Sequence, residues 1–430
     1  MSAGPIVIPP TAAERSVWLR VGTLLDGGDS APAKDAHIVY DGTQIRFVGR
    51  EGRTPPPGVL RPGQRAPDVD APEATLLPGL VEAHAHLFLE GGEIEPARRA
   101  AQLQATPAEL LVAATGRLEA LVRLGVVAVR DAGDRHGVGL ALSRRCAAPD
   151  RPLMPYVDSP GAAIHHRGRY GGFMAEPSEE FPTPAACVEA RVRAGADRIK
   201  LIATGIIDFK KARVTSAPQM DAAEIAAYVA AARRLGRQTF AHASGDTGIE
   251  AVIEGGVDSV EHGFFIRDDQ LARMRDRRIA WVPTFVPVQK QVELAAAVGW
   301  DAAVVGNLRG ILERHAASLA RAHAMGVLIA AGSDAGSFGV AHGHGLLDEL
   351  ELMERAGMPA LAVINAATGV SAARFGYREP FGRIAPGGRS RFIVTRHPPL
   401  ATVTNLRQPR AVVFDGRVLE CDGAAGAKGL

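Results

Sequence analysis

The sequence predicts an α/β protein in which a (β/α)8 barrel of the TIM type is joined to a small β-sandwich domain. Two observations carry this prediction. Through the middle of the chain, short apolar runs of β-type composition alternate with amphipathic helical stretches, which is typical of βα units around a parallel sheet. At both ends of the chain, short β-type runs are instead separated by Asp-Gly turns.

The two ends predict a single small domain. An Asp-Gly pair between two alternating apolar runs is a strong hairpin signal, and it occurs at Asp41–Gly42 and again at Asp415–Gly416. We therefore expect residues 1–75 and 383–430 to form the β-sandwich domain together, with the barrel at residues 76–382. The strands expected at the two ends are residues 17–21, 36–40, 45–48, 391–395, 411–414 and 417–419.

The middle of the chain contains eight apolar runs that fit strands, and eight βα units are enough to close a barrel. A doubly wound open sheet is the alternative, but no Gly-x-Gly-x-x-Gly phosphate loop follows an early strand. Helices are expected at residues 108–124, 184–194, 221–235 and 302–324. The eight runs are residues 75–81, 126–130, 154–159, 198–203, 238–241, 259–261, 280–285 and 327–331.

The composition excludes several classes of protein. The 430 residues carry a formal net charge of +2, which gives no electrostatic reason to expect nucleic acid or a membrane surface as a partner. No run approaches the roughly 18 apolar residues that span a bilayer, and no secretory signal is evident. The three cysteines, Cys146, Cys187 and Cys421, are too widely spaced to suggest a disulfide framework. We therefore expect a cytoplasmic protein.

Side chains that can bind a metal ion stand at the ends of the predicted strands. His84 and His86 follow the first run, and in an extended chain they project to the same side, about 6–7 Å apart. His242, His262 and Asp334 follow the fifth, sixth and eighth runs. The C-terminal ends of barrel strands meet at one mouth, so these side chains are expected to converge. Imidazole and carboxylate suit zinc and its first-row neighbours.

Lys200 lies within the fourth apolar run, where a charged ammonium group is costly. Burial should lower the pKa of this amine toward neutrality, and a neutral amine is nucleophilic. Such an amine can add carbon dioxide to form a carbamate, whose two oxygens could bridge two metal ions. The alternative is a buried lysine paired with a carboxylate such as Asp158.

Five segments together resemble the amidohydrolase superfamily, in the branch of imidazolonepropionase-like and prolidase-like metal-dependent hydrolases. The resemblance covers nearly the whole chain, including both β-rich ends. Each motif is weak alone, but the combination is specific. The segments are Leu-Pro-Gly-Leu-Val-Glu-Ala-His-Ala-His at residues 77–86, Ile-Lys-Leu at 199–201, Ala-His-Ala at 241–243, Ser-Val-Glu-His-Gly at 259–263 and Ala-Gly-Ser-Asp-Ala-Gly at 331–336.

The resemblance implies two divalent metal ions, with zinc expected and manganese, iron or cobalt as alternatives. It also implies that N6-carboxylated Lys200 bridges the two ions. A metal-activated hydroxide would attack a carbonyl, while Asp334 would take its proton and pass it to the leaving nitrogen. The first metal would be bound by His84, His86 and Asp334, and the second by His242 and His262.

The loop after the third run, residues 160–172, is expected to line the substrate pocket. Its extra basic and aromatic residues depart from the glycine-rich segment with one histidine that prolidase-like relatives carry. We assign His165 a catalytic role as a hydrogen-bond partner of the substrate carbonyl, and Arg169 or Tyr170 a role in binding a substrate carboxylate. A solvated loop is the alternative. His342 and His344 lie between glycines and are expected to be rim or structural residues.

The expected activity is hydrolysis of a small linear amide, such as an N-acyl amino acid or a dipeptide, Xaa-Pro dipeptides included. One alternative is a hydrolase that opens a cyclic amide or an imidazolone ring, and another is a hydrolase of a xenobiotic amide or ester. A non-catalytic assembly protein is a further alternative, but such proteins normally lose ligands. The expected partner is a small-molecule substrate, and a homo-oligomer is left open.

Overall fold

The structure is a computed structural model that describes residues 8, 16–28, 30–375 and 381–420. By its internal contacts the chain divides into two compact units. The first unit comprises Met1–Val81, Ala120–Val127 and Ala360–Leu430, and the second comprises Glu82–Glu119 and Ala128–Pro359. The domain boundaries expected at residues 75 and 383 stay predictions.

The described strands of the first unit form one seven-stranded sheet in the order β16-β15-β14-β4-β1-β2-β3. The hairpins expected at Asp41–Gly42 and Asp415–Gly416 are confirmed, since β2 pairs antiparallel with β3 and β15 with β16. The two-sheet arrangement of the expected β-sandwich stays a prediction. The strands are β1 (Val17–Leu24), β2 (Ala33–Asp41), β3 (Gln44–Gly49), β4 (Val69–Pro78), β14 (Arg391–Thr395), β15 (Pro409–Phe414) and β16 (Arg417–Glu420).

Parallel strands form the framework of the second unit. Four of its strands make a parallel sheet in the order β13-β12-β11-β8, and a three-stranded sheet has the order β5-β6-β7. β5 and β6 begin in the first unit and continue into the second. The strands are β5 (Leu80–Ala85), β6 (Val126–Asp131), β7 (Tyr156–Asp158), β8 (Ile199–Ile202), β11 (Thr239–Ala243), β12 (Ser259–His262) and β13 (Ala280–Val282), with the short pair β9 (Ile207–Asp208) and β10 (Arg213–Val214).

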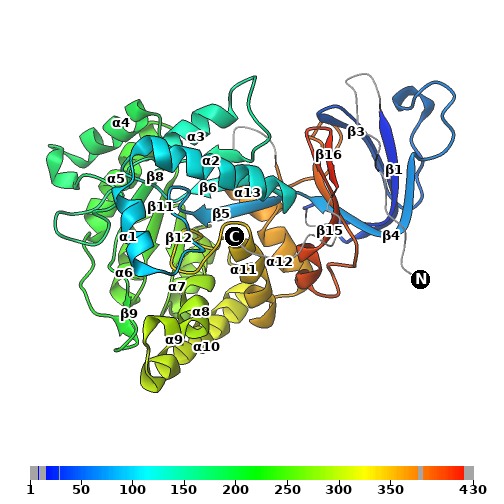
Figure 1. Ribbon diagram of the computed structural model, residues 1–430. Helices are drawn as coiled ribbons and strands as arrows, with labels where there is room; N and C mark the ends of the chain where they lie inside the picture. The colour runs from blue at the N-terminus through cyan, green and yellow to red at the C-terminus, as the bar shows by residue number, and fades with distance from the viewer. Residues whose placement is uncertain (1–7, 9–15, 29, 376–380, 421–430) are drawn as a thin grey trace. The chain divides into compact units, whose positions relative to one another are not determined.

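Helices connect the parallel strands, and α4 packs against α5, α5 against α6, and α6 against α7 (Figure 1). The four helices expected from the sequence are confirmed as α2, α4, α5 and α10, within one residue at each end. The helices are α1 (Pro96–Gln104), α2 (Pro107–Arg123), α3 (Val138–Cys146), α4 (Pro184–Ala194), α5 (Ala222–Arg234), α6 (Asp246–Gly255), α7 (Asp268–Asp276), α8 (Val286–Glu293), α9 (Ala295–Val298), α10 (Ala302–Met325), α11 (His344–Arg355), α12 (Ala360–Ala366) and α13 (Gly369–Phe375).

The first expected barrel strand, residues 75–81, is wrong as a single element. Its first part belongs to β4 in the seven-stranded sheet, and β5, which carries His84, starts only at Leu80. The break falls at Gly79, where an added Cβ would lie 2.2 Å from a methyl group of Val127. The chain therefore passes from one sheet to the next at a residue that has to be glycine.

The eighth expected strand, residues 327–331, forms only an isolated bridge between Ile329 and Trp281. Its backbone nevertheless bonds on both sides, because Leu328 O accepts from Trp281 N at 2.8 Å and Ala331 O accepts from Ala83 N at 2.9 Å. A second isolated bridge joins Ile164 to Leu201 of β8. These two segments extend the edges of the parallel sheets without the continuous ladder that defines a strand.

Two further observations concern the described part of the chain. No helix there is both long enough and apolar enough to cross a membrane. Cys146 and Cys187 are buried and form no disulfide within the described residues, and Cys421 lies outside those residues.

Candidate functional site

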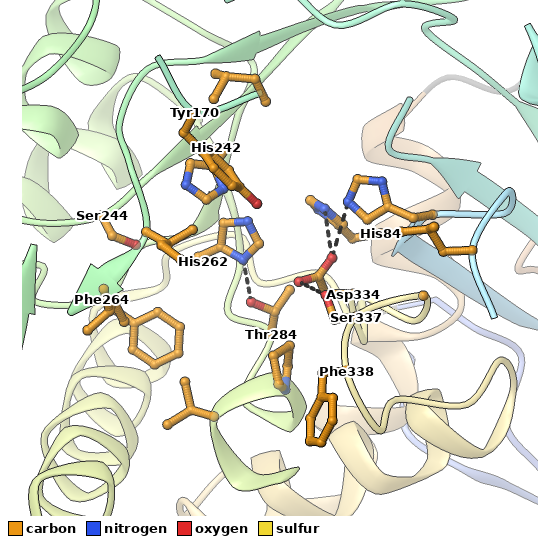
Figure 2. A pocket seen from close by; sticks show the side chains of 18 of the residues that line it. His84, Tyr170, His242, Ser244, His262, Phe264, Thr284, Asp334, Ser337 and Phe338 are labelled. Carbon is orange, nitrogen blue, oxygen red and sulfur yellow. Dashed lines mark hydrogen bonds and ion pairs between the residues drawn. The ribbon is translucent and has the colours of Figure 1, made fainter. Parts of the chain in front are cut away.

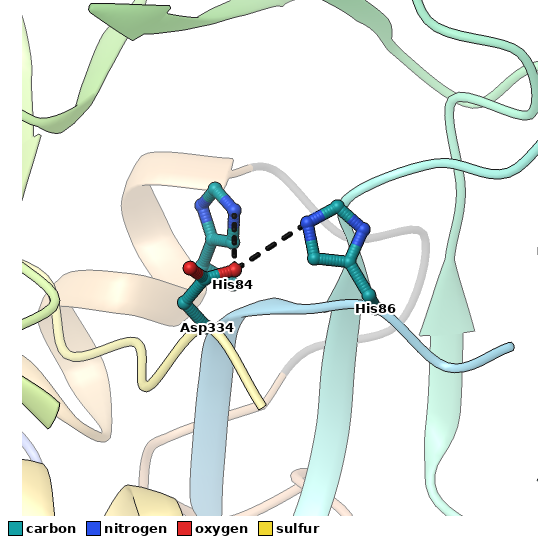
Figure 3. A group of neighbouring side chains, drawn as sticks. All are labelled: His84, His86 and Asp334. Carbon is teal, nitrogen blue, oxygen red and sulfur yellow. Dashed lines mark ion pairs between the residues drawn. The ribbon is translucent and has the colours of Figure 1, made fainter. Parts of the chain in front are cut away.

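The structure brings His84, His86 and Asp334 together as a group whose ligand atoms lie within 4.8 Å of one another (Figure 3). Asp334 Oδ1 lies 3.6 Å from His84 Nε2 and 3.4 Å from His86 Nε2. His84 lies inside β5, and His86 follows directly after the end of that strand. The carboxylate therefore faces both imidazoles, as metal ligands do.

The buried carboxylate of Glu82 forms hydrogen bonds with both chain segments that carry these ligands. Glu82 Oε1 accepts from the backbone N–H of His84 at 3.0 Å and from that of Ser333 at 2.9 Å, while Oε2 accepts from Ser333 Oγ at 2.6 Å. Asp334 follows with φ at 56°, a left-handed backbone that side chains rarely adopt. A strained backbone of this kind persists only where the surrounding structure holds it. Here this backbone conformation directs the Asp334 carboxylate toward His84 and His86.

His242 and His262 come from the adjacent strands β11 and β12, and their ring centres lie 4.5 Å apart (Figure 2). His262 also lies close to the first group, with its ring centre 5.1 Å from that of His84. Its φ of 69° is a second left-handed backbone at the site. The four histidines expected from the sequence therefore share one cavity.

Each of these four histidines has one ring nitrogen directed at an acceptor of the protein. His84 Nδ1 donates to the carboxylate of Glu261 at 2.6 Å, and His262 Nδ1 donates to Thr284 Oγ1 at 2.7 Å. His86 Nδ1 faces Gly133 O, and His242 Nε2 faces Gly205 O, each at 3.4 Å. A neutral imidazole has one N–H, so the lone pairs remain on Nε2 of His84, His86 and His262 and on Nδ1 of His242.

The donor set fits a divalent metal ion. His84 Nε2 and Asp334 Oδ1 are buried and have no hydrogen-bond partner within the described residues. Burial lowers the pKa of His84 to about 4 and that of His242 to about 3, so both are neutral ligands at pH 7. Burial opposes ionisation of Asp334, but its neighbouring histidines hold the pKa of this carboxyl well below its usual range. Neutral imidazoles with free lone pairs beside an ionised carboxylate are what a metal requires.

Lys200 lines the same cavity from β8 and is 2% exposed. Its Nζ lies 4.7 Å from the centre of the Phe240 ring. Burial lowers the pKa of its amine to about 8, with the nearby Arg130 guanidinium acting in the same direction and the Glu261 carboxylate opposing it. The alternative pairing of Lys200 with Asp158 is not observed among the described residues, and the partner of Asp158 is Arg198, whose Nε lies 2.6 Å from Asp158 Oδ2.

A buried ion pair lies directly behind His84. Arg130 Nη2 and His84 Nδ1 both donate to Glu261 Oε2, each at 2.6 Å, and Ser259 Oγ donates to Oε1, also at 2.6 Å. Burial opposes ionisation of Glu261, but Arg130 and His84 hold the pKa of its carboxyl at about 2. The ionised carboxylate fixes His84 in the form that presents Nε2 to the cavity.

We expect Glu261→Gln to weaken metal binding about 10- to 100-fold, because the amide keeps the shape but loses the charge that orients His84. Metal titration followed by calorimetry measures this change. Loss of the negative charge beside the buried Arg130 guanidinium should also destabilise the fold by about 3–5 kcal/mol. Glu254→Gln on the surface of α6 is the matched control. Adding Arg130→Met to Glu261→Gln should recover stability without recovering metal affinity. Unchanged affinity in Glu261→Gln would contradict the orienting role.

The site lies in a cavity of about 300 Å³ whose wall is mostly apolar (Figure 2). Two apolar clusters contribute to this wall. One contains Phe264 and Val288, and the other contains Met174 and Ile202. Such a cavity has the size and character of a small-molecule site.

The three residues expected to bind substrate lie in different surroundings. Tyr170 lines the cavity, with its ring centre 5.3 Å from that of His242. Arg169 is exposed and donates to Ala217 O, and it lines a neighbouring cavity that shares Tyr170 with the first. His165 is buried, and its Nδ1 and Nε2 face the carbonyl oxygens of His166 and Ala175 at 2.9 and 3.1 Å. Its contact with a substrate stays a prediction that requires the ring to turn.

The neighbouring His166 forms ion pairs with Glu179 at 2.8 Å and Glu224 at 2.9 Å. Burial opposes its protonation, but the two carboxylates prevail and raise the pKa of His166. Because folding raises this pKa, the ion pairs of protonated His166 stabilise the folded state fully below about pH 6.5. This stabilisation is lost as the pH rises through the pKa of His166 in the folded protein. We expect His166→Gln to lower Tm by about 1–3 °C at about pH 6 and less at about pH 9. His136→Gln is the control, and an equal loss at both pH values would contradict the ion pairs.

The second His-x-His motif lies apart from the His84 group. His342 is buried and donates from Nε2 to Leu89 O at 2.8 Å, which supports the structural role expected of it. His344 is exposed at the start of α11. Neither residue joins the group of converging ligand atoms.

The sequence by itself predicts no role for several residues that hold the site in place. Glu82, Arg130 and Glu261 are charged residues within or directly after short runs that the sequence predicts to be strands, and a charge at such a position is the signal that could have identified them. Thr284 and Arg99 carry no such signal, because their neighbours become apparent only in the folded chain.

Comparisons with known proteins agree with this arrangement. The family described as "Amidohydrolase family" matches residues 75–419. Ochratoxinase of Aspergillus niger is 27% identical over 448 residues, covering 95% of this chain and 87% of that protein. Imidazolonepropionase of Pseudomonas aeruginosa is 32% identical over 143 residues, covering 28% of this chain and 34% of that protein. A crystal structure of a Xaa-Pro dipeptidase with bound methionine in the active site has a TM-score of 0.78 and 25% identity, covering 94% of this chain and 100% of that one.

Proposed function

The chain belongs to the amidohydrolase family, and from this premise we propose that it hydrolyses the carbon–nitrogen bond of a small linear amide with two divalent metal ions. An N-acyl amino acid or a dipeptide, Xaa-Pro included, is the proposed substrate class. The observation that carries the proposal is the set of four histidines in one cavity, each with one nitrogen committed to the protein and the other left for a ligand.

The proposed metal sites follow from this donor set. His84, His86 and Asp334 would hold one ion, and the neighbouring His242 and His262 would hold the other. Lys200, whose pKa of about 8 leaves part of the amine neutral at pH 7, is proposed to be N6-carboxylated and to bridge the two ions. Zinc is the proposed metal. A bound divalent ion supplies a Lewis acid that polarises a carbonyl and lowers the pKa of water.

The chain's own residues then have distinct tasks. Asp334 accepts a proton from the attacking water at Oδ1 and delivers it to the leaving nitrogen, so that water adds across the broken bond. Its Oδ2 accepts from Ser337 Oγ at 2.9 Å, which fixes the orientation of the carboxylate. Tyr170 forms one wall of the substrate cavity. Arg169 and His165 remain proposed substrate contacts, with His165 turning toward the carbonyl.

The fold is proposed to be the closed (β/α)8 barrel, formed by residues 76–382. The backbone bonds of residues 327–331 to β13 and to Ala83 support closure on one side, and the Ile164 bridge to β8 supports it on the other. Residues 1–75 and 383–430 are proposed to form the β-sandwich domain.

Amine release from a panel of N-acyl amino acids, dipeptides and cyclic amides tests this function. The protein is expressed with added zinc or manganese, and bound metal is counted by mass spectrometry. We expect about two ions per chain and hydrolysis within one linear class. Hydrolysis of cyclic amides alone would replace the proposal by a ring-opening hydrolase. Full metal occupancy with no amide hydrolysed would overturn it.

A further inference from the structure

Arg99 is the one arginine in the wall of the catalytic cavity as the structure describes it. It lies on α1, is half-buried, and points its guanidinium toward the segment that carries Asp334. Arg99 Nη2 lies 3.3 Å from Gly336 O, and Gly336 is two residues from Asp334, so the Cα atoms of Gly336 and Asp334 are at most about 7 Å apart. A small substrate with one group bound at Arg99 can therefore extend to Asp334.

The charge of Arg99 is not balanced by an ion pair within the described residues. Its hydrogen bonds go to three carbonyl oxygens, those of Glu90 at 3.3 Å, Glu93 at 3.1 Å and Gly336 at 3.3 Å. The carboxylate of Glu93, which acts on Arg99 through its charge, is instead paired with Arg98 at 3.4 Å. An arginine has five N–H groups, so two of them are left for a ligand.

The surroundings of Arg99 make an anion the expected ligand. The aromatic ring of Phe338, also in the cavity wall, has its centre 5.8 Å from the guanidinium carbon. The other cation of the wall, Lys200, is next to Phe240 and the metal ligands, where the proposed function already assigns it. A half-buried guanidinium with free N–H groups beside apolar surface binds a carboxylate more strongly than one in open water does.

Resting on the proposed function, we propose that Arg99 is a specificity-determining residue that binds a carboxylate of the amide substrate. N-acyl amino acids and dipeptides already carry such a carboxylate, and the apolar clusters of the remaining wall narrow this class to members that also carry an apolar group. Hydrolysis of such a compound breaks the amide bond, with the hydroxyl of water going to the carbonyl carbon and its proton to the nitrogen. The carboxylate at Arg99 takes no part in this bond change and serves only to hold the substrate.

The test compares substrates that differ only in the carboxylate. N-benzoyl-leucine and its decarboxylated analogue N-benzoyl-isopentylamine are supplied to the metal-loaded wild-type enzyme and to Arg99→Met, Arg99→Lys and Arg98→Met. Arg98 is the matched control, since it lies one position earlier on α1 with a side chain that is 76% exposed. Both kcat and KM are measured, and calorimetry measures binding of the same pair independently of turnover.

We expect Arg99→Met to raise KM and Kd for the carboxylate compound roughly 10- to 100-fold while leaving those for the analogue unchanged. Arg99→Lys should restore part of the preference, and Arg98→Met should match the wild type. An equal loss for both compounds would mean that Arg99 only holds the loop at Glu90 and would overturn the inference. A wild-type enzyme that binds both compounds equally would overturn it as well. Absence of any amide hydrolysis, with the binding preference intact, would contradict the proposed function alone.

Discussion

Replacing Asp334 by asparagine is expected to lower kcat by about 10²- to 10⁴-fold, because the amide cannot accept the proton that the reaction has to move. The fold should survive, since the amide side chain would still lie between His84 Nε2 and His86 Nε2 and can donate to either of them. Steady-state kinetics on the best substrate of the amide panel measures the loss, with the metal content determined on the same preparation.

A graded variant separates proton transfer from simple misplacement of Asp334. Ser337→Ala removes only the hydroxyl that donates to Asp334 Oδ2 at 2.9 Å, so we expect a loss of about tenfold with the pH profile unchanged. Asp334→Asn should instead abolish the acidic limb of that profile. If Asp334→Asn keeps activity within about tenfold of the wild type, Asp334 is not the proton carrier.

Replacing Lys200 by methionine is expected to remove at least one of the two proposed metal ions and to lower activity at least about 100-fold. Methionine has a similar length and no ammonium, so it fills the same buried position next to Phe240 without a charge. The metal-free variant should be more stable than the metal-free wild type, because burial disfavours the charged amine that methionine replaces.

Two measurements check the Lys200 prediction. Mass spectrometry counts the metal ions per chain, and thermal unfolding in the presence of a chelator compares the metal-free proteins. Lys211→Ala, in an exposed loop where the side chain pairs with Asp208, is the control and should change neither quantity. A Lys200→Met protein with full metal content and full activity would eliminate the bridging role.

Much of the fold is predictable because it depends on local pattern. The hairpins at Asp41–Gly42 and Asp415–Gly416 form because these pairs supply the left-handed backbone of a tight turn, and Asp415 has φ at 50°. Helix α5 starts after Asp221 because that side chain accepts from Glu224 N. The apolar composition of residues 327–331 predicts a strand, yet the hydrogen bonds of this segment to Trp281 and Ala83 depend on partners far away in sequence.

The ligand types are also predictable, but their exact chemistry is not. A histidine at the end of an apolar strand can be recognised in the sequence. Which of its two ring nitrogens carries the proton depends on an acceptor that is distant in sequence. For His84 that acceptor is Glu261, 177 residues away. The surroundings of His165 illustrate the same point, since its two ring nitrogens face the carbonyl oxygens of His166 and Ala175.

Residue type and spacing alone predict the alternation of strands and helices and the histidines, Lys200 and Asp334 as candidate ligands, and five motifs in the sequence resemble the amidohydrolase superfamily. These are properties that can be read along the chain. Packing in three dimensions determines which ring nitrogens face the cavity. It also brings Glu82 of β5 into hydrogen-bond contact with Ser333 and places Arg99 in the cavity wall. The physical reason is that hydrogen bonds and buried charges pair groups brought together by packing, and the segments concerned lie as much as 251 residues apart.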